Sequence, residues 1–227
     1  MRDITLTSPR RRLLLAAALA AAIPAARADA ESDAVDYFRA VQLDNVGAIR
    51  KVLARGLDPN RREPGNGETG LILAMRYDAN QTLDLLLSQS GIDIEARAPN
   101  GNTALMMAAF RQNKPAVLKL LAKGAQVNQT GWTALHYAAA AGNTELVALL
   151  LEHYAYIDCE SPSGMTPLMI AAREGKEEVV QQLLQEGADA TLKDGGFHQT
   201  AAEFAIKADK PWIAKTINDF LSARTRR

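Results

Sequence analysis

The chain is poor in the residues from which catalytic and metal sites are usually built. It has one cysteine, Cys159, and three histidines among 227 residues. A single thiol excludes an intramolecular disulfide and cannot complete a zinc cluster. No two histidines have the spacing of a metal-ligand pair, and the Gly-x-Ser-x-Gly nucleophile motif is absent. These absences predict a protein that is not an enzyme and that uses no cofactor and no metal.

Neither sign of charge is in excess, with 26 basic and 26 acidic residues. The segment 1–28 holds five of the arginines and one aspartate, so the remainder has 21 basic and 25 acidic residues and a net charge of −4. Phosphate binding requires a concentrated basic surface, which a slightly acidic chain of this kind does not suggest. We therefore expect no nucleic-acid partner.

Residues 1–28 have the layout of a secretory signal peptide. Three arginines, Arg10 to Arg12, precede an uncharged apolar run from Leu13 to Ile23. This run is too short for a membrane-spanning helix, which needs about 20 residues. Ala26-Arg27-Ala28 then supplies the small residues of a cleavage site. We expect cleavage near Ala28, a periplasmic mature protein and no membrane association after cleavage.

The export route stays open at this point. The arginines followed by Leu13 and Leu14 also resemble a twin-arginine signal, although Pro9 stands where that pattern has Ser or Thr. A general secretory signal with a basic start fits as well. A mitochondrial transit peptide is a third interpretation, because Asp3 is the only acidic residue of this Arg-rich segment.

Beyond the leader, a phrase recurs at intervals of about 33 residues, a period typical of repeat arrays. Its threonines are Thr69, Thr103, Thr133, Thr166 and Thr200, and the interval that ends at Thr133 is the shortest. The phrase reads Gly-Asn-Thr-Ala-Leu-Met-Met-Ala-Ala from Gly101 and Gly-Met-Thr-Pro-Leu-Met-Ile-Ala-Ala from Gly164. Repetition at this period predicts a stacked array, because one such unit buries too little apolar surface to fold alone.

These phrases resemble the ankyrin repeat, whose signature is Thr-Pro-Leu-His-x-Ala-Ala. The second half of that repeat also recurs, in Leu120-Leu121 before Gly124-Ala125 and in Leu183-Leu184 before Gly187-Ala188. The resemblance covers roughly residues 33–221. It implies an all-α solenoid of about six helix-turn-helix units joined by β-hairpin or loop fingers, and a protein that binds another protein.

The expected organisation places a capping repeat at each end of four internal repeats. The ranges are 29–66 for the N-terminal cap, 67–100, 101–130 (with a short finger), 131–163 and 164–196 for the repeats, and 197–227 for the C-terminal cap with its basic tail. We expect Tyr37, Phe38 and Val41 to face inward in the first cap. In the last cap, Trp212, Ile213 and Ile217 are expected to pack inward. A monomer is expected.

Within a unit, each threonine is expected to cap the first helix with its hydroxyl group. A glycine such as Gly187 is expected to end the second helix in the left-handed conformation. The resemblance gives His136 the usual histidine position, which implies a local bond between repeats. Cys159 stands at a small-residue position and is expected to be buried and unreactive.

Two departures from the repeat pattern are individual to this chain. The short interval between Thr103 and Thr133 removes three residues from one finger, which predicts a notch in the finger row beside Trp132. Tyr154 stands where Gly124 and Gly187 end the neighbouring helices. A residue other than glycine in a left-handed turn costs on the order of 1 kcal/mol.

By the resemblance, a partner protein binds along the concave face made by fingers and first helices. The residues expected there carry large apolar groups or guanidinium groups, which dominate binding energy at interfaces; they are Tyr77, Phe110, Trp132, Met165, Arg76, Arg111 and Arg173. Such a face suits an acidic, partly apolar partner. We expect another exported protein to be scaffolded, protected or regulated there. An immunity or inhibitor-type protein for one exported toxin or enzyme is an alternative, and a small-molecule sensor is a third.

Overall fold

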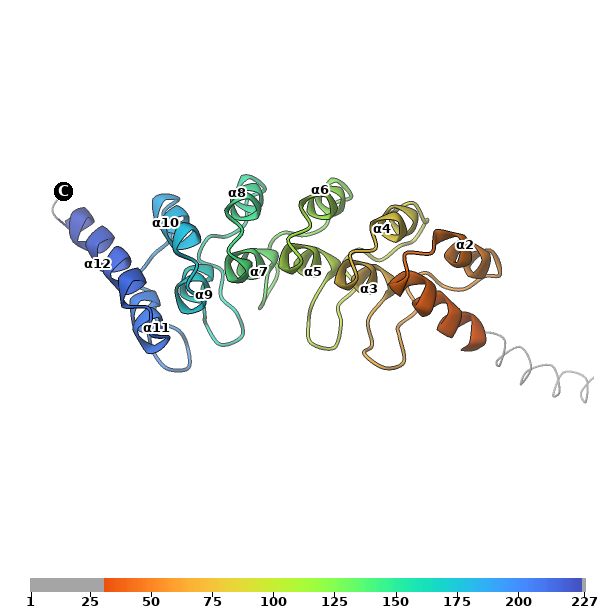
Figure 1. The fold of residues 1–227 in the computed structure, drawn as a ribbon, viewed down its shortest axis with the longest axis horizontal. Coiled ribbons are helices and arrows are strands. Elements are labelled where there is room, and N and C mark those ends of the chain that lie inside the picture. Colours follow the sequence, from red (N-terminus) through yellow and green to blue (C-terminus); the bar gives the residue numbers. More distant parts are fainter. Residues whose placement is uncertain (1–30, 226–227) are drawn as a thin grey trace, which may run out of the picture.

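The structure, a computed structural model, describes residues 31–225 as an arched row of helix pairs (Figure 1). The leader expected at residues 1–28 lies outside the described residues. Residues 31–42 form the first helical segment. The helices that follow are α2 (Val46–Ala54), α3 (Gly70–Arg76), α4 (Asn80–Leu87), α5 (Ala104–Phe110), α6 (Lys114–Ala122), α7 (Ala134–Ala141), α8 (Thr144–Glu152), α9 (Pro167–Glu174), α10 (Glu177–Gln185), α11 (Ala201–Lys207) and α12 (Pro211–Thr225). The predicted all-α solenoid is confirmed.

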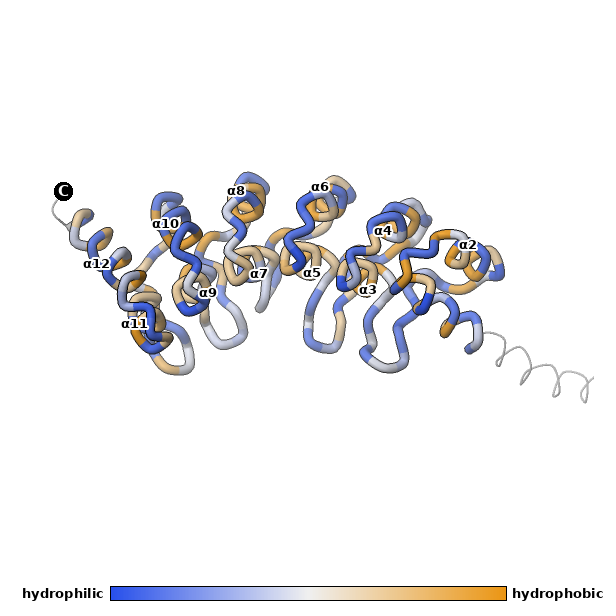
Figure 2. Tube along the Cα trace, viewed as in Figure 1, coloured by the Kyte–Doolittle hydropathy of each residue, from blue (hydrophilic) through white to orange (hydrophobic). Residues whose placement is uncertain are grey.

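The helices form two rows along the array. In Figure 1 the first helix of each internal repeat lies in an inner row above the hanging finger loops, and the second lies in an outer row. Within the inner row, α5 packs on α7, α7 on α9 and α9 on α11. Apolar residues concentrate where the two rows meet (Figure 2). The core is therefore a continuous strip along the array.

Residue size explains how closely the rows pack. One position of the inner helices is alanine in every unit and has no exposed surface: Ala74, Ala108, Ala138, Ala171 and Ala205. A side chain that ends at Cβ lets the neighbouring helix approach without leaving a void. The matching outer helices bury leucine at one shared position: Leu86, Leu120, Leu150 and Leu183.

The fingers are loops closed by backbone hydrogen bonds. The amide of Ala98 donates to the Asn102 carbonyl at 2.9 Å, and that of Ser161 donates to the Met165 carbonyl at 2.9 Å. The loop before α7 is visibly shorter than these two (Figure 1). At its base the Glu95 carboxylate of the preceding repeat accepts from the Gln129 side chain at 2.6 Å. The sequence interval therefore identified a real irregularity, and a side chain from the neighbouring repeat fixes its base.

Three of the threonines cap their helices as predicted. Thr103, Thr166 and Thr200 each accept, at 3.3 Å, from the amide three residues ahead. The prediction is wrong for Thr69, whose buried hydroxyl makes no capping bond. Thr133 directs its hydroxyl toward the His136 ring instead, at 3.0 Å from Nδ1.

The two ends of the array are closed differently. At the first end Tyr37, Phe38 and Val41 are buried, as expected. The Tyr37 ring fills the space beside Gly70, where a Cβ would overlap its hydroxyl. Tyr37 also donates to the Pro59 carbonyl at 3.1 Å.

At the last end Ile213 and Ile217 are buried, but the inward placement of Trp212 is wrong. Trp212 is 53% exposed. Its position corresponds to Glu145 and Glu178, which face water in the preceding outer helices. Among residues 31–225, no helix combines the length and hydrophobicity needed to cross a membrane.

Candidate protein-binding surface

Three aromatic side chains meet on the inner helix row beside the short finger. Phe110 ends α5, Trp132 precedes α7, and Tyr137 lies within α7. The Phe110 and Tyr137 ring centroids are 5.9 Å apart in an edge-on arrangement, and those of Trp132 and Tyr137 are 6.0 Å apart. We call Phe110, Trp132 and Tyr137 the aromatic cluster. Edge-on and offset ring pairs of this kind stabilise one another beyond simple burial.

Tyr137 was not among the site residues expected from the sequence. Its position carries Met107 and Ile170 in the adjacent repeats, both buried and purely apolar. The Tyr137 hydroxyl reaches the Asn102 side chain and donates to Oδ1 at 2.6 Å. The signal that could have found it is a tyrosine at a position where the adjacent repeats have aliphatic residues, since a phenol hydroxyl that is partly withdrawn from water usually finds a hydrogen-bond partner.

The buried His136 ring packs against the Trp132 ring of the aromatic cluster. Its ring centroid lies 5.3 Å from that of Trp132. The backbone amide of Thr133 can only donate, so Nδ1 accepts from it at 3.2 Å. The proton is then on Nε2, which donates to the Met165 carbonyl of the next repeat at 3.0 Å. Burial lowers the pKa of His136. His136 therefore joins two repeats through hydrogen bonds, which is the structural role expected for it from the sequence.

Cys159 belongs to the same contact network and is half-buried. Its Sγ lies 3.3 Å from the Thr133 hydroxyl and 3.7 Å from His136 Nδ1. Burial raises the pKa of the Cys159 thiol to about 11, so the thiol is neutral near pH 7. Since the thiolate is the reactive species, this environment disfavours nucleophilic chemistry.

The expectation that Met165 lies outward on the binding face is wrong. Only 7% of Met165 is exposed. Glu68 and Asn102 stand at the same position of the internal repeats that begin at residues 67 and 101, and they are buried too, whereas Trp132 at this position is half-buried. The Met165 carbonyl is held by His136, and its Sδ lies 3.6 Å from Nη1 of Arg173.

The three arginines expected to form a basic strip are each paired within the chain. Arg76 holds the buried Glu68 carboxylate, with Nε donating to Oε2 at 2.9 Å. Through Nε, Arg111 donates to Asp78 of the preceding repeat at 3.0 Å. The third, Arg173, donates to Glu174 at 3.0 Å. The guanidinium charges are therefore locally balanced, and the face is less basic than its arginines suggest.

Tyr77 and Phe110 remain the open apolar groups of this face. They are 50% and 51% exposed. Trp132 is half-buried and packs against the hydrophobic core. Of the seven residues predicted for the site, Phe110 and Trp132 thus meet in one cluster, while Tyr77 lies one repeat away.

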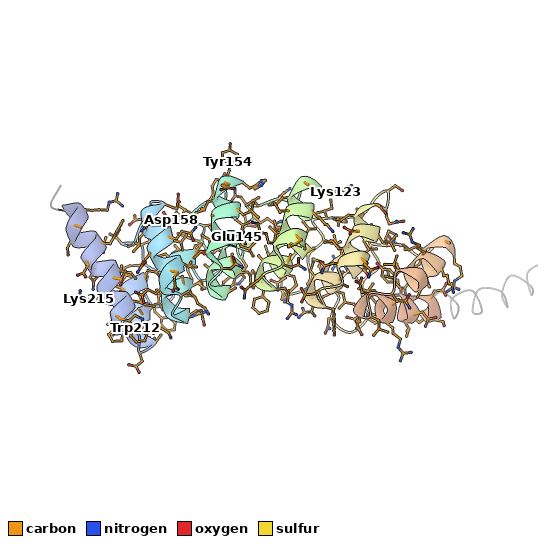
Figure 3. The ribbon with its side chains drawn as sticks, turned by 45° about the horizontal axis from the view of Figure 1, so that its top comes forward. Lys123, Glu145, Tyr154, Asp158, Trp212 and Lys215 are labelled. Atoms are coloured by element: carbon orange, nitrogen blue, oxygen red, sulfur yellow. The ribbon has the colours of Figure 1, made fainter. Side chains whose placement is uncertain are left out.

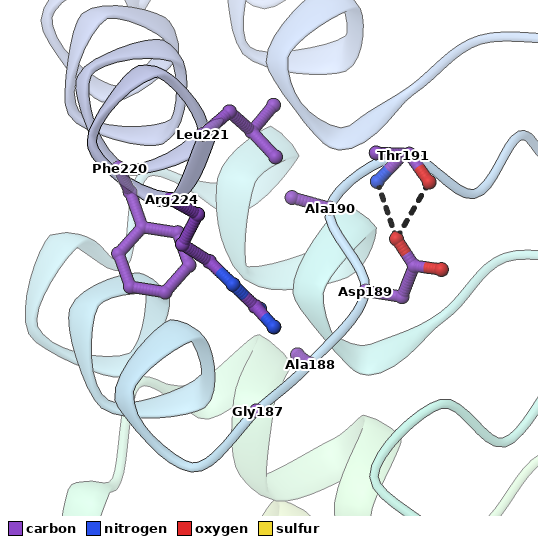
Figure 4. A pocket seen from close by; sticks show the side chains of 8 residues that line it. All are labelled: Gly187, Ala188, Asp189, Ala190, Thr191, Phe220, Leu221 and Arg224. Carbon is purple, nitrogen blue, oxygen red and sulfur yellow. Dashed lines mark hydrogen bonds between the residues drawn. The ribbon is translucent and has the colours of Figure 1, made fainter. Parts of the chain in front are cut away.

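A hollow of about 430 Å³ lies elsewhere, between residues 187–191 and α12 (Figure 4). Arg224 and Phe220 line one side, and Asp189 is turned toward Thr191, from whose amide it accepts at 2.9 Å. This hollow is at the C-terminal end of the array and lends no support to a ligand pocket at the Trp132 notch. No group of three potential metal ligands occurs among the described residues.

The stacked helix pairs, finger loops and closed ends define a helical repeat protein. A family model described as ankyrin repeats in three copies matches residues 37–130 and 111–194. Because these matches span more than half of its length, the chain belongs to the ankyrin repeat family. This confirms the resemblance on which the fold expectation rested.

Curated relatives share the repeats within much longer chains. The chain is 35% identical over 153 residues to SH3 and multiple ankyrin repeat domains protein 2 of Homo sapiens, covering 66% of this chain and 8% of the relative. It is 31% identical over 160 residues to transient receptor potential cation channel subfamily A member 1 of Homo sapiens, covering 66% and 14%. Against protein glp-1 of Caenorhabditis elegans the values are 36% over 148 residues, 59% and 11%. Ankyrin repeats are generally non-catalytic modules, and their presence indicates a module of protein–protein interaction.

Proposed function

We propose that this protein is a periplasmic interaction module that scaffolds, protects or regulates another exported protein through its concave face. The observation that carries the proposal is the aromatic cluster beside the shortened finger. It offers the half-exposed Phe110 ring at the end of α5, in the repeat that precedes the shorter finger loop of Figure 1.

The cluster is already arranged for binding. The Phe110, Trp132 and Tyr137 rings fix one another, and the Asn102 side chain fixes the Tyr137 hydroxyl. Side chains that are ordered before association lose little entropy when a partner binds. Rigid aromatic anchors are also the commonest source of binding energy at protein interfaces.

The charges of this face suit a partner with an apolar centre. Arg76 and Arg111 are already bound to Glu68 and Asp78, so an acidic partner would have to compete with carboxylates of this chain. Paired charges at a rim contribute more to specificity and association rate than to affinity. We therefore revise the expected partner from an acidic surface to one that presents apolar or aromatic side chains to Phe110.

Periplasmic location rests on the leader pattern of residues 1–28. Mass measurement of the N-terminus of the protein recovered from a periplasmic fraction tests it. Cleavage near Ala28 supports export, whereas an intact N-terminus in the cytoplasmic fraction contradicts it.

Affinity capture from the periplasmic fraction tests the binding surface. The wild type is compared with the Tyr77→Ala/Phe110→Ala double variant and with Trp212→Ala, which removes an equally exposed aromatic ring from the far end. We expect the double variant to lose its partner and Trp212→Ala to retain it. Retention by both variants at unchanged affinity would overturn the concave-face proposal.

The identity of the captured proteins separates the alternatives. Several unrelated partners favour a scaffold. One stoichiometric partner whose activity falls on binding favours the immunity or inhibitor-type function.

A further inference from the structure

Tyr154 occupies a left-handed conformation at a position where other repeats of this chain have glycine. It follows α8 with φ 63°, where Gly56, Gly124 and Gly187 end the matching helices of other repeats at φ 94°, 90° and 100°. L-residues adopt this region at a cost. The Tyr154 side chain is nevertheless 85% exposed, so packing of its ring does not offset that cost. Figure 3 shows the ring standing clear of the helix end.

Tyr156, two residues later, is a second exposed ring at a position that is polar elsewhere. The matching residues are Asp58, Gln126 and Asp189, whereas Tyr156 is 69% exposed. Asn128 of the preceding repeat holds the turn. Its side chain donates to the Tyr154 carbonyl at 2.7 Å and accepts from the Tyr156 amide at 2.8 Å. We call Tyr154 and Tyr156 the tyrosine edge.

The turn that carries the tyrosine edge and the matching turn of the next repeat are rich in carboxylates. Four lie in or beside these turns: Glu152, Asp158, Glu186 and Asp189. Asp158 accepts from the Asp189 amide at 3.1 Å, which joins the two repeats here. None of the four carboxylates belongs to an ion pair among residues 31–225. The nearby cations are Lys123 in the preceding repeat and Arg224, whose charge acts on Asp189.

We propose that the tyrosine edge is a second docking surface, which binds a lysine- or arginine-bearing segment of a protein partner. A cation over a tyrosine face is attracted by the ring, and unpaired carboxylates beside the ring add charge complementarity. The edge lies at the C-terminal end of α8 in the outer helix row, whereas the aromatic cluster lies at α5 and α7 in the inner row (Figure 1). The protein then has two separate surfaces and bridges two partners. This inference does not depend on the concave-face proposal.

Nuclear magnetic resonance titration of the mature protein tests the proposal. The probe is a peptide of alternating arginine and glycine, and its control is the same peptide with uncharged citrulline for arginine. We expect the arginine peptide to shift the amides of residues 153–158 saturably and the citrulline peptide to leave them unchanged. If both tyrosine rings contact arginine side chains, removing the two rings should weaken binding of the arginine peptide by about tenfold.

The decisive variant is Tyr154→Gly/Tyr156→Asp, which installs the residues that the next repeat has at Gly187 and Asp189. It adds a carboxylate, so charge attraction alone would make this variant bind the arginine peptide more tightly. We expect it to bind about tenfold more weakly, while Phe110→Ala binds like the wild type. Unchanged or tighter binding by the double variant, or equal binding of the citrulline peptide, overturns the proposal.

Discussion

The aromatic residues of the middle repeats form two groups that relate to the rest of the fold in opposite ways. In the aromatic cluster the rings contact one another, and the Trp132 ring packs against the buried His136. In the tyrosine edge both rings are mostly exposed, and only the backbone of the turn is held, by Asn128.

The rings of the aromatic cluster contribute packing to the fold, whereas the rings of the tyrosine edge are exposed and contribute little packing. Removing a ring from the cluster takes away packing, so a binding defect there has to be distinguished from a folding defect. The Tyr154 ring is largely free of packing, and replacing the residue with glycine also relieves a strained backbone. A strained and exposed residue of this kind is therefore more informative about function than one that also stabilises the core.

The largest effect is expected for Trp132→Ala. Truncating a fully buried aromatic residue costs about 3–5 kcal/mol, and Trp132 is half-buried, so we expect a loss of about 2 kcal/mol in the free energy of unfolding. Urea unfolding followed by circular dichroism measures it, with Trp212→Ala as the exposed control. A loss below about 0.5 kcal/mol would show that the cluster is not part of the packed core.

Next in size is Asn128→Ala, which tests whether the backbone of the tyrosine edge is structural. The substitution removes both inter-repeat hydrogen bonds, and we expect a loss of about 1–2 kcal/mol. Asn128→Asp keeps the acceptor and loses the donor, as Asp158 does in the next repeat, so its loss is expected to be smaller. Equal losses in the two variants would mean that the hydrogen bond from the Tyr156 amide to the side chain at position 128 contributes nothing.

Tyr154→Gly is expected to stabilise the protein by about 1 kcal/mol, because glycine adopts the left-handed turn without strain. The reciprocal variant is Gly124→Ala, where an added Cβ meets no atom within 4 Å and only the backbone term changes. It should lose a similar amount. A melting temperature that moves in the same direction for both variants would contradict this assignment of strain.

How far the sequence could predict these two groups depends on the range of the interactions involved. The left-handed turn at Tyr154 was predictable, because Gly124 and Gly187 report the backbone conformation of the same position in other repeats. The helix pairs were predictable for the same reason, because the sequence pattern around the repeat threonine occurs five times and each occurrence indicates the same local structure.

The surface chemistry was not predictable in the same way. Arg111 is paired with Asp78, 33 residues earlier, and Tyr137 with Asn102, 35 residues earlier. Met165 is buried because the neighbouring repeat covers it. Such contacts are made between adjacent repeats. The pattern of a single repeat predicts which positions face outward or inward, but it does not show which side chain of the adjacent repeat contacts each position.

The smallest effect is a pH dependence confined to the aromatic cluster. Burial lowers the pKa of His136 below its unfolded value of about 6.5, so the unfolded state binds the proton first as pH falls. The contribution of neutral His136 is therefore complete above about pH 6.5 and is lost as pH falls from there toward the folded pKa, at no more than about 1.4 kcal/mol per pH unit. Urea unfolding at pH 7.5 and pH 5.5 should show a steeper loss for the wild type than for His136→Gln. His153→Gln, at an exposed site, should follow the wild type. An equal loss in the free energy of unfolding for the wild type and His136→Gln would mean that the His136 ring accepts a proton in the folded state as easily as in the unfolded state.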